Sequence, residues 1–283
     1  MATNTLISPG VLELENDQSF IAQQPVTVGA AIIGPTVKGP VEVPTIVTSW
    51  SDYQNKFGST FLSGSSVYSY FTSIAAYNYF LNGGQTMLVA RVTTGSFTSA
   101  YTSGSTNNGS AVLNISGTVA LQFNTLSQGA LMNSFGPLDA SGSLASGSVD
   151  NIRWQITNSD TSQGTFSLLI RQGDDTTNNP TVLETWTNLS MDPTAPNFVS
   201  KVIGDQYKSY NAVDNQVEVN GTYPNASRYV YVASVSTPTP FYFDNTGVAK
   251  TQFTASIPTN ASGAFAGATG NLFNGGEIGR AHV

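Results

Sequence analysis

Two short apolar segments, residues 26–34 and 86–93, flank two stretches that have the periodicity of helices. The first of these stretches begins at Ser49, and Asp52 three residues later completes a pattern typical of a helix N-cap. Parallel strands cannot be joined by a tight turn and need a crossover, which is usually a helix. The order strand, helix, helix, strand therefore predicts a parallel strand pair within a small α/β unit over residues 26–95.

The second helical stretch is expected to begin at Ser65 or Ser66 and to end at Gly83-Gly84, because glycine commonly terminates helices. Six aromatic side chains crowd this stretch and point in more directions than one buried face can hold. Most of them are expected in the core, and packing of one side on a neighbouring subunit is the alternative. They are Tyr68, Tyr70, Phe71, Tyr77, Tyr79 and Phe80.

The rest of the chain changes character twice. Residues 1–25 alternate only loosely and are expected to form an extended arm, either a frayed terminus or a strand that needs a partner. Residues 96–150 are dominated by Ser, Gly, Thr and Asn, which predicts a β-rich, loop-rich protruding insertion. Residues 151–276 recover regular patterns, with strands expected at residues 152–156, 164–171, 181–189, 229–233 and 251–257.

Composition excludes several functional classes. The net charge of −7 argues against nucleic-acid binding, which needs a basic face. The chain has no cysteine, which excludes disulfides, thiolate metal sites and cysteine nucleophiles. The one histidine, His282, lies beside the C-terminus and cannot be relied on as the base of a catalytic triad. We therefore expect no catalytic residue, no cofactor and no metal site, and we recognise neither a signal peptide nor a membrane span.

Structural roles also account for the aspartates that could otherwise suggest a functional site. The pair Asp174-Asp175 is expected to lie in a turn, where aspartate makes local hydrogen bonds, and a weak cation site is the alternative. Asp192, before Pro193, is expected to cap a helix.

Five segments resemble, in their order along the chain, the motifs of contractile phage-tail sheath proteins, and together they span residues 8–205. The segments are SPGVLEL at residues 8–14, VGAAIIGPTVKGP at 28–40, TSWSDYQNKFG at 48–58, the helix that ends in NGG at 82–84 with the strand to Arg91, and LETWTNLSMDP at 183–193 with the NFV at 197–199.

The resemblance implies a virion structural protein, not an enzyme. Such subunits assemble in the host cytoplasm, polymerise as hexameric rings around the tail tube, and contract to drive genome delivery through the host envelope. The implied partners are further copies, the tail tube protein, the baseplate and the tail terminator, with no nucleic acid and no membrane insertion. The implied fold is a mixed α/β, α+β multidomain chain, in which residues 151–276 are an incomplete subtilisin-like α/β portion without protease function.

The resemblance also assigns roles to residues. The N-terminal arm of the family completes a sheet in a neighbouring subunit, so a partner strand becomes the favoured interpretation of the arm. The implied strand-exchange residues are Ile7, Ser8, Pro9, Gly10, Val11, Leu12, Glu13 and Leu14. The implied structural motif residues are Gly34, Pro35, Gly39, Pro40, Phe57, Gly58, Gly83, Gly84 and Arg91.

The end of the sequence departs from the family. Nothing corresponds to the family's C-terminal, tube-facing domain, and residues 277–283 resemble the in-frame translation of a common sequencing adapter, so we expect them to be non-native. Two other functions stay open. One is a sheath of a related contractile injection system, such as a tailocin or a type VI-like device. The other is a β-rich surface adhesin or receptor-binding module.

Overall fold

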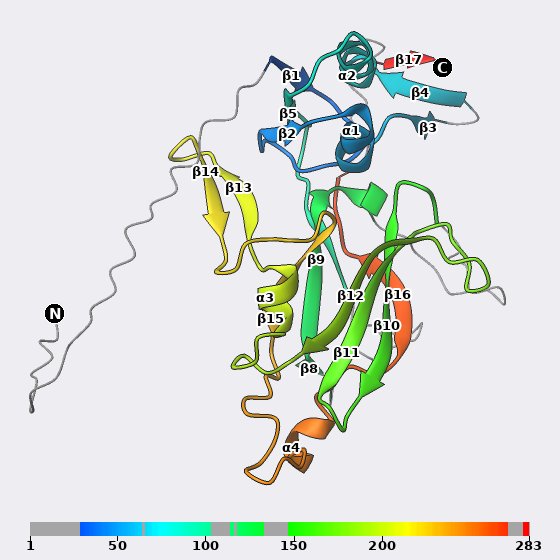
Figure 1. Cartoon of the computed structure of the whole chain (residues 1–283). Helices are drawn as coiled ribbons and strands as arrows, with labels where there is room; N and C mark the ends of the chain where they lie inside the picture. Colours follow the sequence, from blue (N-terminus) through cyan, green and yellow to red (C-terminus); the bar gives the residue numbers. More distant parts are fainter. Residues whose placement is uncertain are drawn as a thin grey trace, which may run out of the picture.

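The computed structural model describes residues 29–63, 66–102, 114–115, 118–132, 147–270 and 280–282. Over these residues the chain is mixed α/β and strand-rich, as expected, with a small sheet at one end and a larger sheet beyond it (Figure 1). The expected arm and the strand-exchange residues 7–14 lie outside the described residues. In the part that the structure describes, no helix combines the length and the apolar character that crossing a membrane requires.

The small sheet contains the parallel strand pair that the sequence predicted. Its strand order is β1-β5-β2, in which β1 and β5 run parallel and β2 is antiparallel to β5. Two helices cover one face of this sheet, where Tyr53, Phe57 and Ala76 meet Met87 and Val89. The elements are β1 (Ala30–Gly34), β2 (Thr45–Val47), α1 (Trp50–Phe57), α2 (Phe71–Leu81) and β5 (Met87–Arg91).

The expected helix start at Ser49 is confirmed, and the start at Ser65 or Ser66 is wrong. The Ser49 hydroxyl accepts a hydrogen bond from the Asp52 amide at the start of α1. The second helix begins only after a hairpin of β3 (Phe61–Ser63) and β4 (Ser66–Tyr70), which also pairs with β17 (Arg280–His282). Stacking between aromatic rings of the two hairpin strands stabilises an antiparallel pair and outweighs the local helical periodicity.

The large sheet has seven strands in the order β12-β11-β10-β16-β6-β9-β15, and every neighbouring pair is antiparallel. The domain boundary expected at residue 150 divides this sheet. Strands β6 and β9 come before residue 150, and the other five strands come after it. The strands are β6 (Ser99–Thr102), β9 (Leu121–Gln128), β10 (Ile152–Asp160), β11 (Thr165–Gln172), β12 (Val182–Ser190), β15 (Val230–Val235) and β16 (Ala261–Ala266).

Alternation explains why these segments form strands with one buried face. Buried and partly exposed residues alternate along the whole of β9. The core includes Trp154, whose indole N–H donates to the carbonyl of Ala264 at 3.1 Å. Gly263 leaves room for this ring, since a Cβ there would lie 2.8 Å from it. The expected strands at residues 152–156, 164–171, 181–189 and 229–233 are confirmed to within a few residues.

Other expectations for residues 151–276 are wrong. Over the residues that the structure describes, this part contributes antiparallel strands and two short helices, not an α/β layer. The strand expected at residues 251–257 is a short helix, and Asp192 does not cap a helix, because the nearest helix begins at Val199. The remaining elements are β7 (Asn114–Ile115), β8 (Thr118–Val119), the 3-10 helix η2 (Ala130–Met132), α3 (Val199–Ile203), β13 (Tyr207–Asn211), β14 (Gln216–Asn220) and α4 (Thr251–Thr254).

Candidate assembly site around residues 34–40

The turn that follows β1 is held closely against the start of α2. The Gly34 carbonyl accepts from the Val92 amide at 3.0 Å, and the Thr72 hydroxyl donates to the Pro35 carbonyl. A Cβ on Gly34 would lie 2.5 Å from the Thr72 methyl, so a larger residue would push the first turn of α2 away. Two of the predicted motif residues, Gly34 and Pro35, therefore set the distance between strand and helix.

The next motif residues meet the end of α1. Gly39 has a φ of 112°, and a Cβ there would lie 2.6 Å from the Phe57 ring. The Lys38 amide donates to the Phe57 carbonyl at 3.0 Å. Gly58 has a φ of 71°, and a Cβ there would lie 2.8 Å from the Cβ of Val37. Both glycines thus combine a left-handed backbone with a close approach, two reasons why no other residue fits.

Arg91 joins this turn to the large sheet. Its side chain is 2% exposed, and its Nη1 atom donates at 2.7 Å to the carbonyls of both Gly39 and Gln128. The guanidinium lies 5.1 Å from the centre of the Phe97 ring. Burial lowers the pKa of Arg91 to about 10. The Gly39 amide also donates to the Ser127 hydroxyl at 2.7 Å. We call Gly39, Arg91, Ser127 and Gln128 the junction.

The structure brings together all the predicted motif residues except Gly83 and Gly84. These two glycines follow the last turn of α2, and the Gly84 amide donates to the carbonyl of Tyr79 at 3.0 Å. They therefore end the helix, as the sequence predicted, but they do not contact the junction. The junction partners on β9, Ser127 and Gln128, were missed, because no local pattern indicates which strand end a buried arginine reaches.

The outer face of α2 is apolar and exposed. Ala76 and Ser73 face the small sheet, whereas Phe71, Tyr77 and Leu81 are exposed, Leu81 to 66%. A helix that is apolar on all sides is usually buried on all sides. This surface fits the alternative that one side of the helix packs on a neighbouring subunit.

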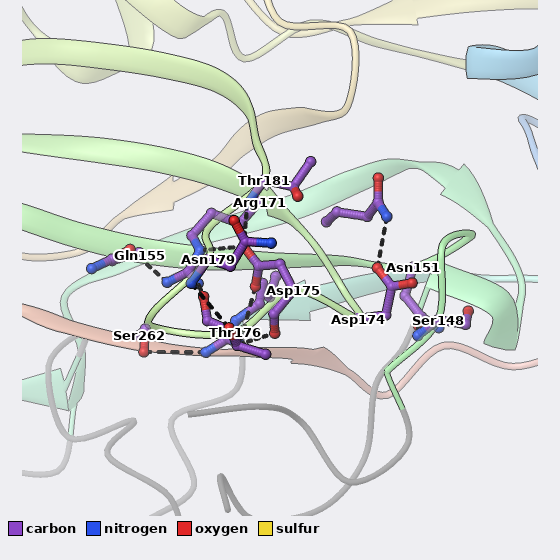
Figure 2. Close-up of polar contacts among 12 residues, drawn as sticks. Ser148, Asn151, Gln155, Arg171, Asp174, Asp175, Thr176, Asn179, Thr181 and Ser262 are labelled. Carbon is purple, nitrogen blue, oxygen red and sulfur yellow. Dashed lines mark hydrogen bonds and ion pairs between the residues drawn. The ribbon is translucent and has the colours of Figure 1, made fainter. Parts of the chain in front are cut away.

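A second polar cluster lies where β10 begins and β11 ends (Figure 2). The Asp175 carboxylate accepts from Arg171 Nε at 2.7 Å, from Arg153 Nη1 at 3.3 Å and from the Thr181 amide at 2.9 Å. Arg171 also donates to the Gln155 side chain at 2.8 Å. All three charged side chains are almost fully buried. We call Arg153, Arg171 and Asp175 the buried ion cluster.

The turn expected at Asp174-Asp175 is confirmed, but its two aspartates differ. Asp174 is exposed and accepts from the Gln172 side chain at 2.7 Å. Asp175 turns inward to the two arginines, which are paired neighbours in the β10–β11 register. Among the residues that the structure describes, no group of three or more His, Cys, Asp or Glu could hold a metal ion.

Three Asp-x-Ser/Thr sequences form local turns in which the carboxylate accepts hydrogen bonds. Hydrogen bonds from Ser162 hold the pKa of Asp160 below its usual value, and those from Thr246 and nearby amides do the same for Asp244. Burial raises the pKa of Asp192, but donors at Thr194 and Tyr242 outweigh burial and hold it below its usual value. Asp192 thus ties β12 to residue 242 instead of capping a helix.

These turns predict that the protein loses stability in acid. The unfolded chain takes up protons at these aspartates at a higher pH than the folded chain does, because the folded pKa values are lowered. The free energy of unfolding should therefore be constant above about pH 5 and should fall as pH drops below about 4. Urea denaturation midpoints determined between pH 2.5 and 6 measure this pH dependence of stability. Asp192→Asn should flatten the acid slope, and an equal slope in this variant would contradict the assignment.

Comparisons with known proteins give several similar solved structures, including two sheath tail proteins. No protein-family model and no curated protein matches the sequence. The fold is similar to a sheath tail protein from Listeria innocua, with a TM-score of 0.36 and 9% identity over 89% of this chain and 36% of that chain. It is also similar to a sheath tail protein from Desulfitobacterium hafniense, with a TM-score of 0.31 and 13% identity over 80% of this chain and 39% of that chain. The chain spans little more than a third of either protein.

Proposed function

We propose that this chain belongs to a structural subunit of a contractile phage tail sheath. In this role it polymerises as hexameric rings around the tail tube and contracts to drive genome delivery. Its partners are further copies, the tail tube protein, the baseplate and the tail terminator. The role is structural and not enzymatic, and the site of action is the tail of the virion after assembly in the host cytoplasm.

One observation carries this proposal. The segments that resemble sheath motifs are far apart in the sequence, yet those at residues 34–40, 57–58 and 91 meet in one place. There the two glycines with a left-handed backbone and the buried Arg91 leave no room for ordinary substitutions. Residues of this kind would be required to hold the small α/β unit at a fixed position on the large sheet.

Apolar surfaces on the small unit also support self-assembly. Phe71, Tyr77 and Leu81 on α2 are each exposed, and Ile33 on β1 is 74% exposed. Exposed apolar side chains of this size are candidates for an interface when they gather in one patch. A polymer would bury these side chains, whereas an isolated subunit leaves them in water.

Electron microscopy of the full-length gene product tests the proposal. We expect tubes or stacked rings, and a product that stays monomeric at high concentration would contradict it. Deletion of residues 1–20, which removes the implied strand-exchange residues, should abolish polymers, because main-chain pairing between subunits would be lost. The far-ultraviolet circular dichroism spectrum should stay that of a folded chain. Deletion of residues 2–5 alone, which keeps residues 7–14, is the matched control and should still polymerise.

A further inference from the structure

Lys38 and Asp150 form a close pair between the two parts of the fold. Lys38 lies in the segment between β1 and β2 of the small unit, and Asp150 lies just before β10 of the large sheet. The Lys38 Nζ atom is 3.8 Å from Asp150 Oδ1, and the two side chains are only 12% and 20% exposed. An amine and a carboxyl group that are far apart in the sequence are therefore held in contact, largely shielded from water.

The backbone on both sides of this contact is fixed by hydrogen bonds. The Lys38 amide donates to the Phe57 carbonyl at 3.0 Å, and the Thr36 hydroxyl donates to the Lys38 carbonyl at 2.8 Å. The Asp150 amide donates to the Ser148 hydroxyl at 3.3 Å. Groups held in a reactive orientation have an effective concentration on the order of 10⁵–10⁸ M. This exceeds the concentration of liquid water, so a condensation that water normally reverses can go forward between the two side chains.

The pair is poorly suited to remain ionic. At 3.8 Å the two atoms are too far apart for a hydrogen bond, so little offsets the removal of both charges from water. Burial lowers the pKa of Lys38 and raises the pKa of Asp150, and the charge of Asp174 raises the pKa of Asp150 further. The attraction between Lys38 and Asp150 opposes these shifts without cancelling them. The surroundings thus favour the uncharged forms, a nucleophilic amine and a protonated carboxyl group.

We propose that Lys38 and Asp150 condense to an isopeptide bond that joins the small α/β unit covalently to the large sheet. The Lys38 Nζ atom attacks the Asp150 Cγ atom and forms the new N–C bond, and the C–OH bond of the carboxyl group breaks. The hydroxyl leaves with one proton of the amine as water, so the step needs no oxidant, cofactor or second substrate. The bond is a covalent link in a chain that has no cysteine and therefore no disulfide. It forms within one subunit and does not depend on the self-assembly proposed above.

Mass spectrometry of the purified full-length gene product tests the proposal. We expect the intact mass to lie about 18 Da below the mass of the sequence, because one water molecule is lost. Trypsin then locates the bond, since it cleaves after a free Lys38 but not after one whose amine is part of an amide. The expected product is residues 1–56 joined to residues 92–153, with one water missing. A full sequence mass, together with separate peptides 1–38 and 39–56, would overturn the proposal.

Lys38→Arg separates the covalent bond from an ordinary ion pair. Arginine keeps a positive charge beside Asp150, but its guanidinium stays protonated and is no nucleophile, so this variant should show its full sequence mass. Lys56→Arg is the matched control and should still lack one water, because Lys56 is 31% exposed and makes a 2.9 Å hydrogen bond to Asp52, as an ordinary ion pair does. A missing water that persists in Lys38→Arg would come from another site, such as an aspartate that cyclises onto its own backbone, and would also overturn the proposal.

Discussion

Replacement of Asp175 by asparagine is expected to lower the free energy of unfolding by about 3–5 kcal/mol, the usual effect of removing one partner from a buried ion pair. The substitution keeps the shape of the side chain but removes its charge. Arg153 and Arg171 would then face each other inside the sheet with no carboxylate between them. Their side chains are almost fully buried, so water cannot replace the lost partner.

Asp174 provides the matched control for this experiment. It is the neighbouring residue of the same turn, but it is exposed, and Asp174→Asn should change the free energy of unfolding by no more than about 0.5 kcal/mol. Urea denaturation followed by tryptophan fluorescence measures both variants, since two of the three tryptophans, Trp154 and Trp186, lie in the sheet that contains the buried ion cluster. Equal midpoints for the two variants would show that Asp175 does not hold the arginines.

Features set by local chemistry were predicted from the sequence. The N-cap at Ser49 depends on residues within one turn, and the parallel pair of β1 and β5 follows from the connection between them. The strand at residues 66–70 was missed because its stability comes from Phe61 across the hairpin, not from its own periodicity. The short helix at residues 251–254 was likewise missed, since four residues carry too little pattern to tell a helix from a strand.

The candidate site was predicted in part. Resemblance alone singled out Gly39, Phe57, Gly58 and Arg91, and the structure shows that they meet. Their partners on β9 were not predictable, because Ser127 and Gln128 are polar residues at the end of a strand with no distinguishing neighbours. The buried ion cluster was missed for a related reason. An Asp-Asp pair in a turn looks solvated until the register of β10 and β11 places two arginines beside it.

Replacement of Arg91 by methionine is expected to loosen the small α/β unit from the large sheet. The variant keeps most of the apolar length of the side chain but loses the hydrogen bonds to Gly39 and Gln128, which are worth about 1.5–3 kcal/mol each because the donor is charged. Burial disfavours the charged guanidinium and lowers the pKa of Arg91 to about 10. Methionine avoids this cost of burying a cation, which offsets part of the loss. The expected net destabilisation is about 2 kcal/mol.

The position of the tryptophans allows the loosening to be measured apart from general destabilisation. Trp50 begins α1 in the small unit, whereas Trp154 and Trp186 lie in the large sheet. The test uses variants in which the other tryptophans are replaced by phenylalanine, so that Trp50 alone, or Trp154 and Trp186 alone, give the signal. In Arg91→Met, the urea midpoint reported by Trp50 should then fall below the one reported by the other two, because the junction no longer couples the two parts. Arg91→Lys should behave similarly, since one ammonium lacks the planar fork of the guanidinium. The exposed Arg228→Met should leave all midpoints together, and coincident, unshifted midpoints in Arg91→Met would contradict a coupling role for the junction.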